Sequence, residues 1–137
     1  MSDLFGKRLL FVTGKGGVGK STAAIALGLV AARRGLRTVV AELASQERAQ
    51  RLFAQNGELF CELRLADNLF TISVDPQHAM EEYLEVKVGA LGQALSSSRL
   101  FSAFAMATPG MRELLSIGKV WELAQFERRT KGSAPYY

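Results

Sequence analysis

The stretch from Phe11 to Thr22 constrains the fold of this chain more than any other part of it. It reads Phe-Val-Thr-Gly-Lys-Gly-Gly-Val-Gly-Lys-Ser-Thr, which contains a glycine, four residues, and then glycine, lysine and a hydroxyl residue. The apolar run before the glycines is typical of a buried strand, and residues 21–32 have the alanine and leucine content of a helix. A strand, a glycine-rich loop and a helix in this order favour a phosphate-binding loop.

The glycines of this loop let the backbone adopt positive φ and approach a ligand closely. Successive amides and the positive end of the following helix then converge on an anion. We expect Lys20 to reach the outer phosphates of a nucleotide and the Ser21 hydroxyl to help hold Mg²⁺. The expected cofactors are therefore ATP and Mg²⁺, although the sequence alone does not separate ATP from GTP. The expected nucleotide-binding residues are Gly14, Lys15, Gly16, Gly17, Val18, Gly19, Lys20, Ser21 and Thr22.

Composition narrows the class of protein. With 137 residues, 48% of them apolar, the chain has the length of one domain and enough apolar bulk for a core. The net charge is +4, but the basic residues are scattered, so we expect no nucleic-acid partner. Cys61 is the only cysteine, which excludes an intrachain disulfide, and we expect it to be buried. Without a signal-peptide pattern or about 18 consecutive apolar residues, we expect a cytoplasmic chain with no membrane span.

Periodicity and capping signals predict an α/β fold, a parallel sheet with flanking helices and the phosphate loop at the carboxyl end of the first strand. Asp75 and Pro76 predict the start of a helix, as do Thr108 and Pro109 near the end of the chain. The expected strands are 9–13, 38–43 and 69–74, and the expected helices are 22–34, 44–54, 77–88, 99–106 and 110–128.

The last predicted helix carries Leu114, Ile117, Trp121 and Ala124 at helical spacing. We interpret this stripe as core-facing, with a membrane-surface or DNA-positioning helix as the alternative. Nearby apolar residues could instead form an adaptable groove for a hydrophobic client, although core packing is the simpler interpretation. These residues are Phe101, Phe104, Met106 and Met111.

Lys15 adds a second lysine directly after the first glycine of the loop. This makes the loop resemble the deviant phosphate loop of nucleotide-dependent dimerising ATPases, in which the extra lysine reaches the nucleotide of the partner subunit. A solvated lysine on an exposed loop is the alternative. Together with residues 72–84 and 109–115, the loop makes the chain resemble the anion-transporting ATPase family. That family includes the arsenical pump-driving ATPase and the ATPase that targets tail-anchored membrane proteins.

The resemblance implies ATP hydrolysis in the cytoplasm by a homodimer that opens and closes around nucleotide. It implies catalytic roles for Lys15 and Lys20, and a membrane pump subunit or a hydrophobic client protein as partner. A nucleotide-gated interaction module without hydrolysis is an alternative, motivated by the departures described next. A partition or positioning ATPase with the same loop is another.

The first departure concerns the carboxylate that orients the attacking water. Family members carry Asp-Pro-Ala-His after the second strand, whereas this chain has Ala-Ser-Gln-Glu at residues 44–47. Glu42 or Glu47 could substitute for the missing aspartate. The similar stretch at Asp75 and His78 follows the third strand, so we interpret it as a helix start, with a displaced switch as the alternative.

The second departure is that no apolar run ending in aspartate follows Trp121. The family would place there a central strand that bears a magnesium-linked aspartate. We therefore expect residues 1–137 to be the N-terminal part of a P-loop ATPase domain, with the rest of a longer chain or a partner supplying that strand. A single Cys61 also supports neither the metalloid site nor the zinc site of family members.

Overall fold

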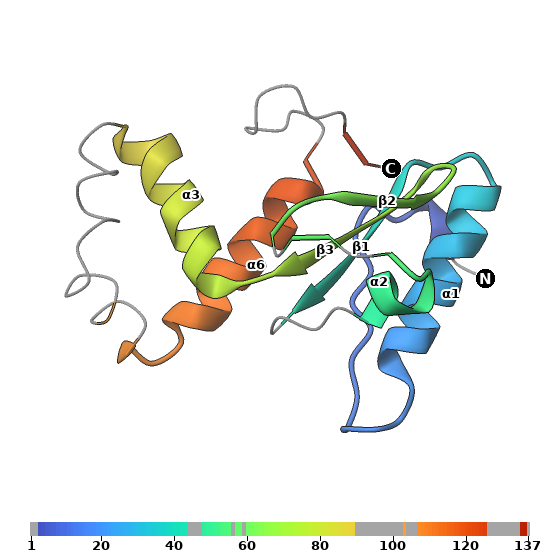
Figure 1. Ribbon diagram of the computed structural model, residues 1–137, viewed down its shortest axis with the longest axis horizontal. Coiled ribbons are helices and arrows are strands. Elements are labelled where there is room, and N and C mark those ends of the chain that lie inside the picture. The colour runs from blue at the N-terminus through green and yellow to red at the C-terminus, as the bar shows by residue number, and fades with distance from the viewer. Residues whose placement is uncertain are drawn as a thin grey trace.

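The computed structural model describes residues 3–43, 48–55, 57–58, 60–89, 103, 107–125 and 135–136. Apart from Ala103, the predicted helix at 99–106 lies outside these residues, as do most of its apolar cluster and residues 44–47. The elements appear in Figure 1 and are, in chain order, η1 (Leu4–Gly6), α1 (Lys20–Arg33), β1 (Thr38–Leu43), α2 (Arg48–Leu52), β2 (Leu63–Ala66), β3 (Leu69–Val74), α3 (Pro76–Val88) and α6 (Met111–Leu123).

The three strands form one sheet in the order β1-β3-β2. β1 and β3 are parallel, with Thr38 opposite Leu69 and Leu43 opposite Val74, and both strands have the predicted bounds. β2 is antiparallel to β3. The sheet is therefore mixed, which corrects the expectation of a wholly parallel sheet. The reason is local: only residues 67 and 68 join β2 to β3, and so short a connection makes a hairpin.

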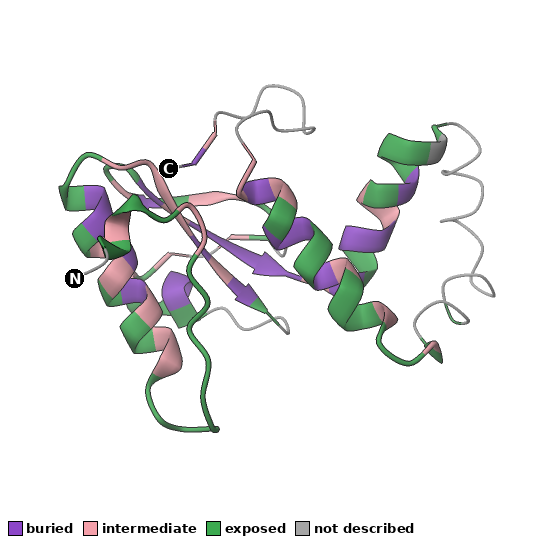
Figure 2. Ribbon diagram, turned by 180° about the vertical axis from the view of Figure 1, so that it is seen from behind, coloured by how far each residue is buried: buried purple, intermediate pink, exposed green. Residues whose placement is uncertain are grey.

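Helices cover the two faces of the sheet, as Figures 1 and 2 show from opposite sides. On one face Ile25 and Ala32 of α1 pack in a core cluster with Val40 of β1 and Leu69 of β3. The opposite face is covered by the end of α6 and by Tyr136, in the cluster Ile72, Val74, Leu123 and Tyr136. Successive side chains of a strand point to opposite faces of the sheet, so the residues directly before and after Val40 in the sequence face this second cluster.

The contact between α1 and β1 depends on a helical glycine. A Cβ built on Gly28 would come within 2.7 Å of Val40 Cγ2 and 3.3 Å of Leu69 Cδ1. Real Cβ contacts essentially never reach the first of these distances. Gly28 therefore sets how closely α1, and with it the loop at its N-terminus, lies on the sheet.

The prediction of a first strand at residues 9–13 is wrong. The segment has no strand assignment, and the side chains of Leu10, Phe11 and Val12 are 38%, 64% and 37% exposed. An apolar run forms a strand only where a neighbouring strand supplies hydrogen bonds. Among the described residues β1 pairs with β3 alone, and its other edge has no strand beside it.

The end of the chain packs as a helix pair, α3 against α6, with Met80 and Leu84 of α3 buried against Leu115. α6 begins after Gly110, which caps it with a φ of 80°, so Thr108 is not its N-cap as predicted. The prediction that the apolar stripe of this helix faces the core is also wrong for its three largest side chains. The exposed fractions of Leu114, Ile117 and Trp121 are 65%, 50% and 64%.

The buried face of α6 carries smaller and more polar side chains than the sequence pattern indicated. Its members are Ser116, Lys119, Val120 and Leu123. The Ser116 hydroxyl donates a hydrogen bond to the Arg112 carbonyl oxygen at 2.9 Å, and Lys119 forms ion pairs with two carboxylates. A hydroxyl and an ammonium group that find partners within the protein can be buried, which periodicity alone does not reveal.

Candidate functional site

The glycine-rich loop ends at the N-terminus of α1, as the sequence predicts. Gly19 is the N-cap with a φ of 87°, and Gly17 has a φ of 78°. Side chains other than glycine rarely adopt these values, so the two glycines are required for the turn into the helix. No side chain caps the helix, and every residue from Leu10 to Gly19 is exposed (Figure 2). The unpaired amides of the first turn are therefore accessible to an anion.

Lys20 bends back over this loop. Its Nζ donates a hydrogen bond to the Lys15 carbonyl oxygen at 2.6 Å. The stem of Lys20 and the Val18 side chain both pass close to Gly14, where an added Cβ would meet Val18 Cγ2 at 3.3 Å and Lys20 Cδ at 3.8 Å. The structure thus brings the Lys20 side chain back to the loop, while Lys15, Val18 and Thr22 are exposed.

Ser21 lies beside the start of α2. Arg48 Nη1 is 3.4 Å from Ser21 Oγ, a long hydrogen bond at an exposed position. Ser21 as a residue is partly buried and belongs to the first turn of α1. A hydroxyl at this place, next to exposed amides and an ammonium group, fits the oxygen ligands that Mg²⁺ prefers beside a bound phosphate.

Glu42 is a residue for which the sequence left the role open. It lies near the end of β1 and is 8% exposed. Its Oε2 accepts a hydrogen bond from the Ala49 amide of α2 at 2.8 Å, whereas its buried Oε1 has no partner among the residues that the structure describes. Glu47, the other carboxylate considered, lies outside the described residues. From the sequence, the alternation of side chains along a strand predicts only that Glu42 lies on the same face of the sheet as Val40, the face that α1 covers.

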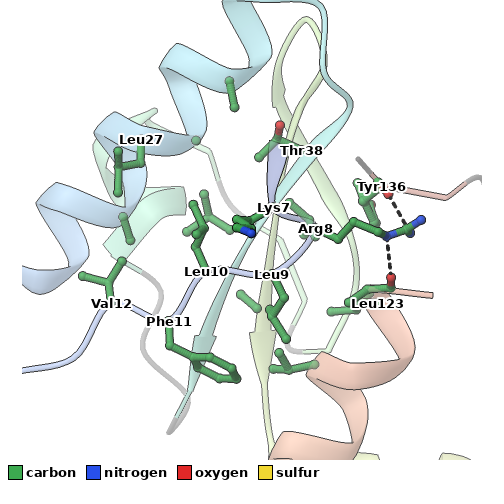
Figure 3. Close-up of a pocket in the computed structure, with 18 of the residues that line it drawn as sticks. Lys7, Arg8, Leu9, Leu10, Phe11, Val12, Leu27, Thr38, Leu123 and Tyr136 are labelled. Atoms are coloured by element: carbon green, nitrogen blue, oxygen red, sulfur yellow. Dashed lines mark hydrogen bonds between the residues drawn. The ribbon is translucent and has the colours of Figure 1, made fainter. Parts of the chain in front are cut away.

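A groove of about 400 Å³ runs along the open edge of β1. Figure 3 shows Leu9, Leu10, Phe11 and Val12 lying on one side of it, with Leu27 of α1 and Thr38 of β1 around it. Of the loop and first helical turn, only Lys20 and Ser21 reach its wall, and Glu42 lies in the same wall. The groove is mostly apolar and adjoins the loop; it is not the phosphate-binding surface itself.

Arg8 ties the segment before the loop to the end of the chain. Its Nε donates to the Ala124 carbonyl at 3.0 Å and its Nη2 to the Tyr136 carbonyl at 3.2 Å (Figure 3). Residues far apart in sequence therefore meet in the wall of the groove. The sequence around Arg8 gives no indication of this contact.

Asp75 and His78 form a helix cap, which confirms the interpretation of this stretch as a helix start. Asp75 Oδ2 accepts from the His78 amide at 3.1 Å and lies 2.7 Å from His78 Nδ1, and Pro76 begins α3. Burial alone raises the pKa of Asp75, but the hydrogen bonds from the His78 amide and ring, and the charge of that ring, outweigh burial and leave the pKa below its usual value.

Cys61 is exposed, so the expectation that it is a buried hydrophobe is wrong. It lies between β2 and the turn at Phe60, where the chain runs along the surface. Within the described ranges no three His, Cys, Asp or Glu side chains gather to form a metal site. Nor does any helix in those ranges combine the length and the apolar character needed to cross a membrane.

The fold is a small β-sheet flanked by helices, and a glycine-rich loop leads into α1. This arrangement is consistent with a P-loop nucleotide-binding domain. The chain belongs to the anion-transporting ATPase family, which matches it over residues 7–129. It is 34% identical over 146 aligned positions to ATPase BagA of Mycobacterium tuberculosis, and equally to a Mycobacterium bovis protein also named as an ATPase. Each alignment covers 99% of this chain and 42% of the relative, so the chain spans less than half their length.

Proposed function

We propose that this chain is the nucleotide-binding part of a magnesium-dependent ATPase. Membership of an ATPase family supports nucleotide use in general. The observation that carries the proposal is the loop itself: it has exposed residues at the start of α1, the Lys20 ammonium group bends back to the Lys15 carbonyl at 2.6 Å, and Ser21 lies in the first helical turn. These groups suit a polyphosphate, because amides and an ammonium group bind its oxygens and a hydroxyl can bind its metal ion.

The residues have separable roles in this proposal. The loop amides between Gly14 and Thr22 bind the phosphate oxygens, and Lys20 exchanges the Lys15 carbonyl for a phosphate oxygen, where its charge counts most in the transition state. Magnesium, when bound, supplies charge neutralisation on the phosphates, and Ser21 is the hydroxyl that would hold it. Gly17 and Gly19 keep the amides turned toward the ligand without intervening side chains.

Lys15 is proposed to act between two copies of the chain. Its side chain is exposed at the outer edge of the loop, while its carbonyl already accepts from Lys20. An exposed ammonium group next to a phosphate site can reach a nucleotide held by a second copy. We therefore propose a homodimer that closes around nucleotide, in the cytoplasm, and that passes this closure to a membrane pump subunit or a hydrophobic client.

Residues 1–137 are proposed to form the N-terminal part of the ATPase domain. The relatives are more than twice as long, since the alignment covers 42% of them. Among the described strands none pairs with the outer edge of β1, and an apolar groove lies beside that edge; both support the same view, because an unpaired apolar strand edge calls for another strand. Amide hydrogen exchange checks this: β1 should exchange much faster in residues 1–137 than in a longer gene product, and equal protection would contradict it.

Binding and turnover of ATP test the proposed function. Calorimetry should detect Mg-ATP binding to the wild-type chain and a loss of binding in Lys20→Ala. Phosphate release should be measured on the longest product of the gene. No binding by well-folded wild-type protein, judged by circular dichroism, would overturn the proposal.

A nucleotide-gated interaction module remains the second candidate. One observation favours it: residues 44–47 contain no aspartate, whereas family members have there the aspartate that orients the attacking water. Light scattering during an ATP titration, together with a phosphate-release assay, separates the two candidates. Dimer formation without turnover would favour the module, and turnover would exclude it.

A further inference from the structure

Glu42 carries a buried carboxylate oxygen that no described residue satisfies. Its side chain is 8% exposed, and Oε1 is shielded from solvent without a hydrogen bond. A buried acceptor without a partner lowers stability, and lowers it further when the acceptor is charged. Such a group needs a reason to be retained.

The contact with α2 accounts for only half of the side chain. Oε2 accepts from the Ala49 amide at 2.8 Å and so satisfies one amide in the first turn of α2. A neutral glutamine could accept the same hydrogen bond through its amide oxygen without placing a negative charge in the interior. The second oxygen therefore points to a further, positively charged partner.

The position of Glu42 suggests what that partner is. Glu42 lines the same groove as Lys20 and Ser21. Ala49, to which it is bonded, directly follows Arg48, whose Nη1 lies 3.4 Å from Ser21 Oγ. Glu42 and the Ser21 hydroxyl thus contact two consecutive residues of α2, Ala49 and Arg48.

We propose that Glu42 is the protein carboxylate of the divalent-cation site to which Ser21 contributes its hydroxyl. The inference rests on the proposed nucleotide site, since the phosphates complete the ligand set. Mg²⁺ is usually held by one or two carboxylates together with substrate phosphates and waters, which matches one carboxylate and one hydroxyl here. Binding of the cation displaces Arg48 from Ser21 and gives Oε1 the positive partner that it lacks.

The test compares nucleotide affinity with and without metal. For the wild-type chain, calorimetry should give ATP binding about tenfold tighter with Mg²⁺ than with EDTA, a gain of about 1.4 kcal/mol. Glu42→Gln keeps the shape and the bond to Ala49, so its affinity for metal-free ATP should stay within about twofold. For Glu42→Gln, Mg²⁺ should increase the affinity for ATP by less than about twofold.

A second measurement detects the metal itself. Mn²⁺ replaces Mg²⁺, and because ATP binds Mn²⁺ by itself, binding to the chain is measured as the change in the paramagnetic resonance signal relative to Mn-ATP without protein. Wild type and the exposed control Glu58→Gln should retain the ion, and Glu42→Gln should release most of it. Glu42→Asp keeps the charge on a shorter side chain and should retain metal partly; it decides the question if Glu42→Gln does not fold.

The outcomes separate this inference from the proposed function. A purely structural Glu42 would lower the melting temperature on substitution and leave the Mg²⁺ gain intact, which would overturn the inference alone. A well-folded wild-type chain that binds no nucleotide would overturn the proposed function, and this inference with it. A Mg²⁺ gain lost in Glu42→Gln but kept in Glu58→Gln supports both.

Discussion

Lys119 of α6 binds Glu82 of α3 with hydrogen bonds of 2.9 and 2.8 Å to its two carboxylate oxygens. The same ammonium group lies 3.2 Å from Glu122, one turn along α6, and 5.0 Å from the centre of the Phe60 ring. With its side chain 5% exposed, Lys119 joins the helix pair to the turn before β2. The pair is held by charge as well as by its small apolar contact.

Replacing Lys119 should therefore destabilise the protein. Lys119→Met keeps the apolar stem but leaves two carboxylates close together without their cation. Removing one partner of a fully buried pair costs about 3–5 kcal/mol, and Glu82 is 27% exposed, so we expect about 2–3 kcal/mol. Urea unfolding measures this change. The control is Lys87→Met at an exposed position of α3, and equal stability of the two variants would contradict the prediction.

Gly28→Ala should destabilise the contact between α1 and β1. Alanine favours a helix by about 1 kcal/mol over glycine, but the added Cβ meets Val40 at 2.7 Å, and overpacking costs about 1–3 kcal/mol. We expect a net loss of about 1 kcal/mol in the free energy of unfolding. Gly118→Ala on α6 is the matched control, because its Cβ would meet nothing within 4 Å and should stabilise. A stabilised Gly28→Ala would show that α1 lies further from the sheet.

Trp121, the single tryptophan, should report an exposed α6 stripe. Its side chain is 64% exposed, so its fluorescence should be strongly quenched by acrylamide in the folded protein. Trp121→Gln should change stability by no more than about 0.5 kcal/mol, as surface substitutions usually do. Leu123→Ala, two positions further on the buried face, should cost about 2–5 kcal/mol. A blue-shifted, protected tryptophan would instead place the stripe in a core.

The Asp75 cap should make stability depend on acid pH. The folded pKa lies below the usual 3.8, so the stability from Asp75 is fully present above that value and is lost as the pH falls through the folded pKa. Asp75→Asn should lower stability at neutral pH and flatten the fall between neutral and acid pH. Melting temperatures over that range measure it, with exposed Asp67→Asn as control. An acid dependence unchanged from wild type would contradict the assignment.

The two loop lysines should have different effects. Lys20→Ala removes the ammonium group that lies over the loop and should weaken ATP binding about 10-fold to 100-fold, since hydrogen bonds to charged groups contribute about 1.5–3 kcal/mol. Lys15→Ala should keep ATP binding within about threefold and lose ATP-dependent dimerisation. Calorimetry and sedimentation measure the two effects. Loss of binding in both variants would mean that Lys15 acts within its own subunit.

Much of the local structure follows from the sequence alone. The bounds of β1 and β3 are as predicted because both are runs of β-branched and apolar residues with a buried face. Asp75 caps α3 because an aspartate before a proline satisfies a free amide wherever a helix starts. The phosphate loop is equally local: glycines at Gly17 and Gly19 allow a turn that other residues resist.

Other features depended on partners that are distant in the sequence. The run at Leu9 is apolar enough for a strand, yet it has no neighbour to pair with among the described residues. The α6 stripe that contains Trp121 faces solvent, and the opposite side of the helix is the buried one, where Lys119 forms an ion pair with Glu82 of α3. No pattern within α6 could reveal that pair.

The sequence by itself determined the loop, the family and most of the regular elements, because these depend on backbone preferences and hydrogen bonds between near neighbours. Only the tertiary structure decided which face of α6 is buried, that β2 runs against β3, and that Glu42 reaches α2 beside Ser21. Burial of a charge or pairing of an edge depends on a partner elsewhere in the chain, and that partner is fixed only when the chain folds.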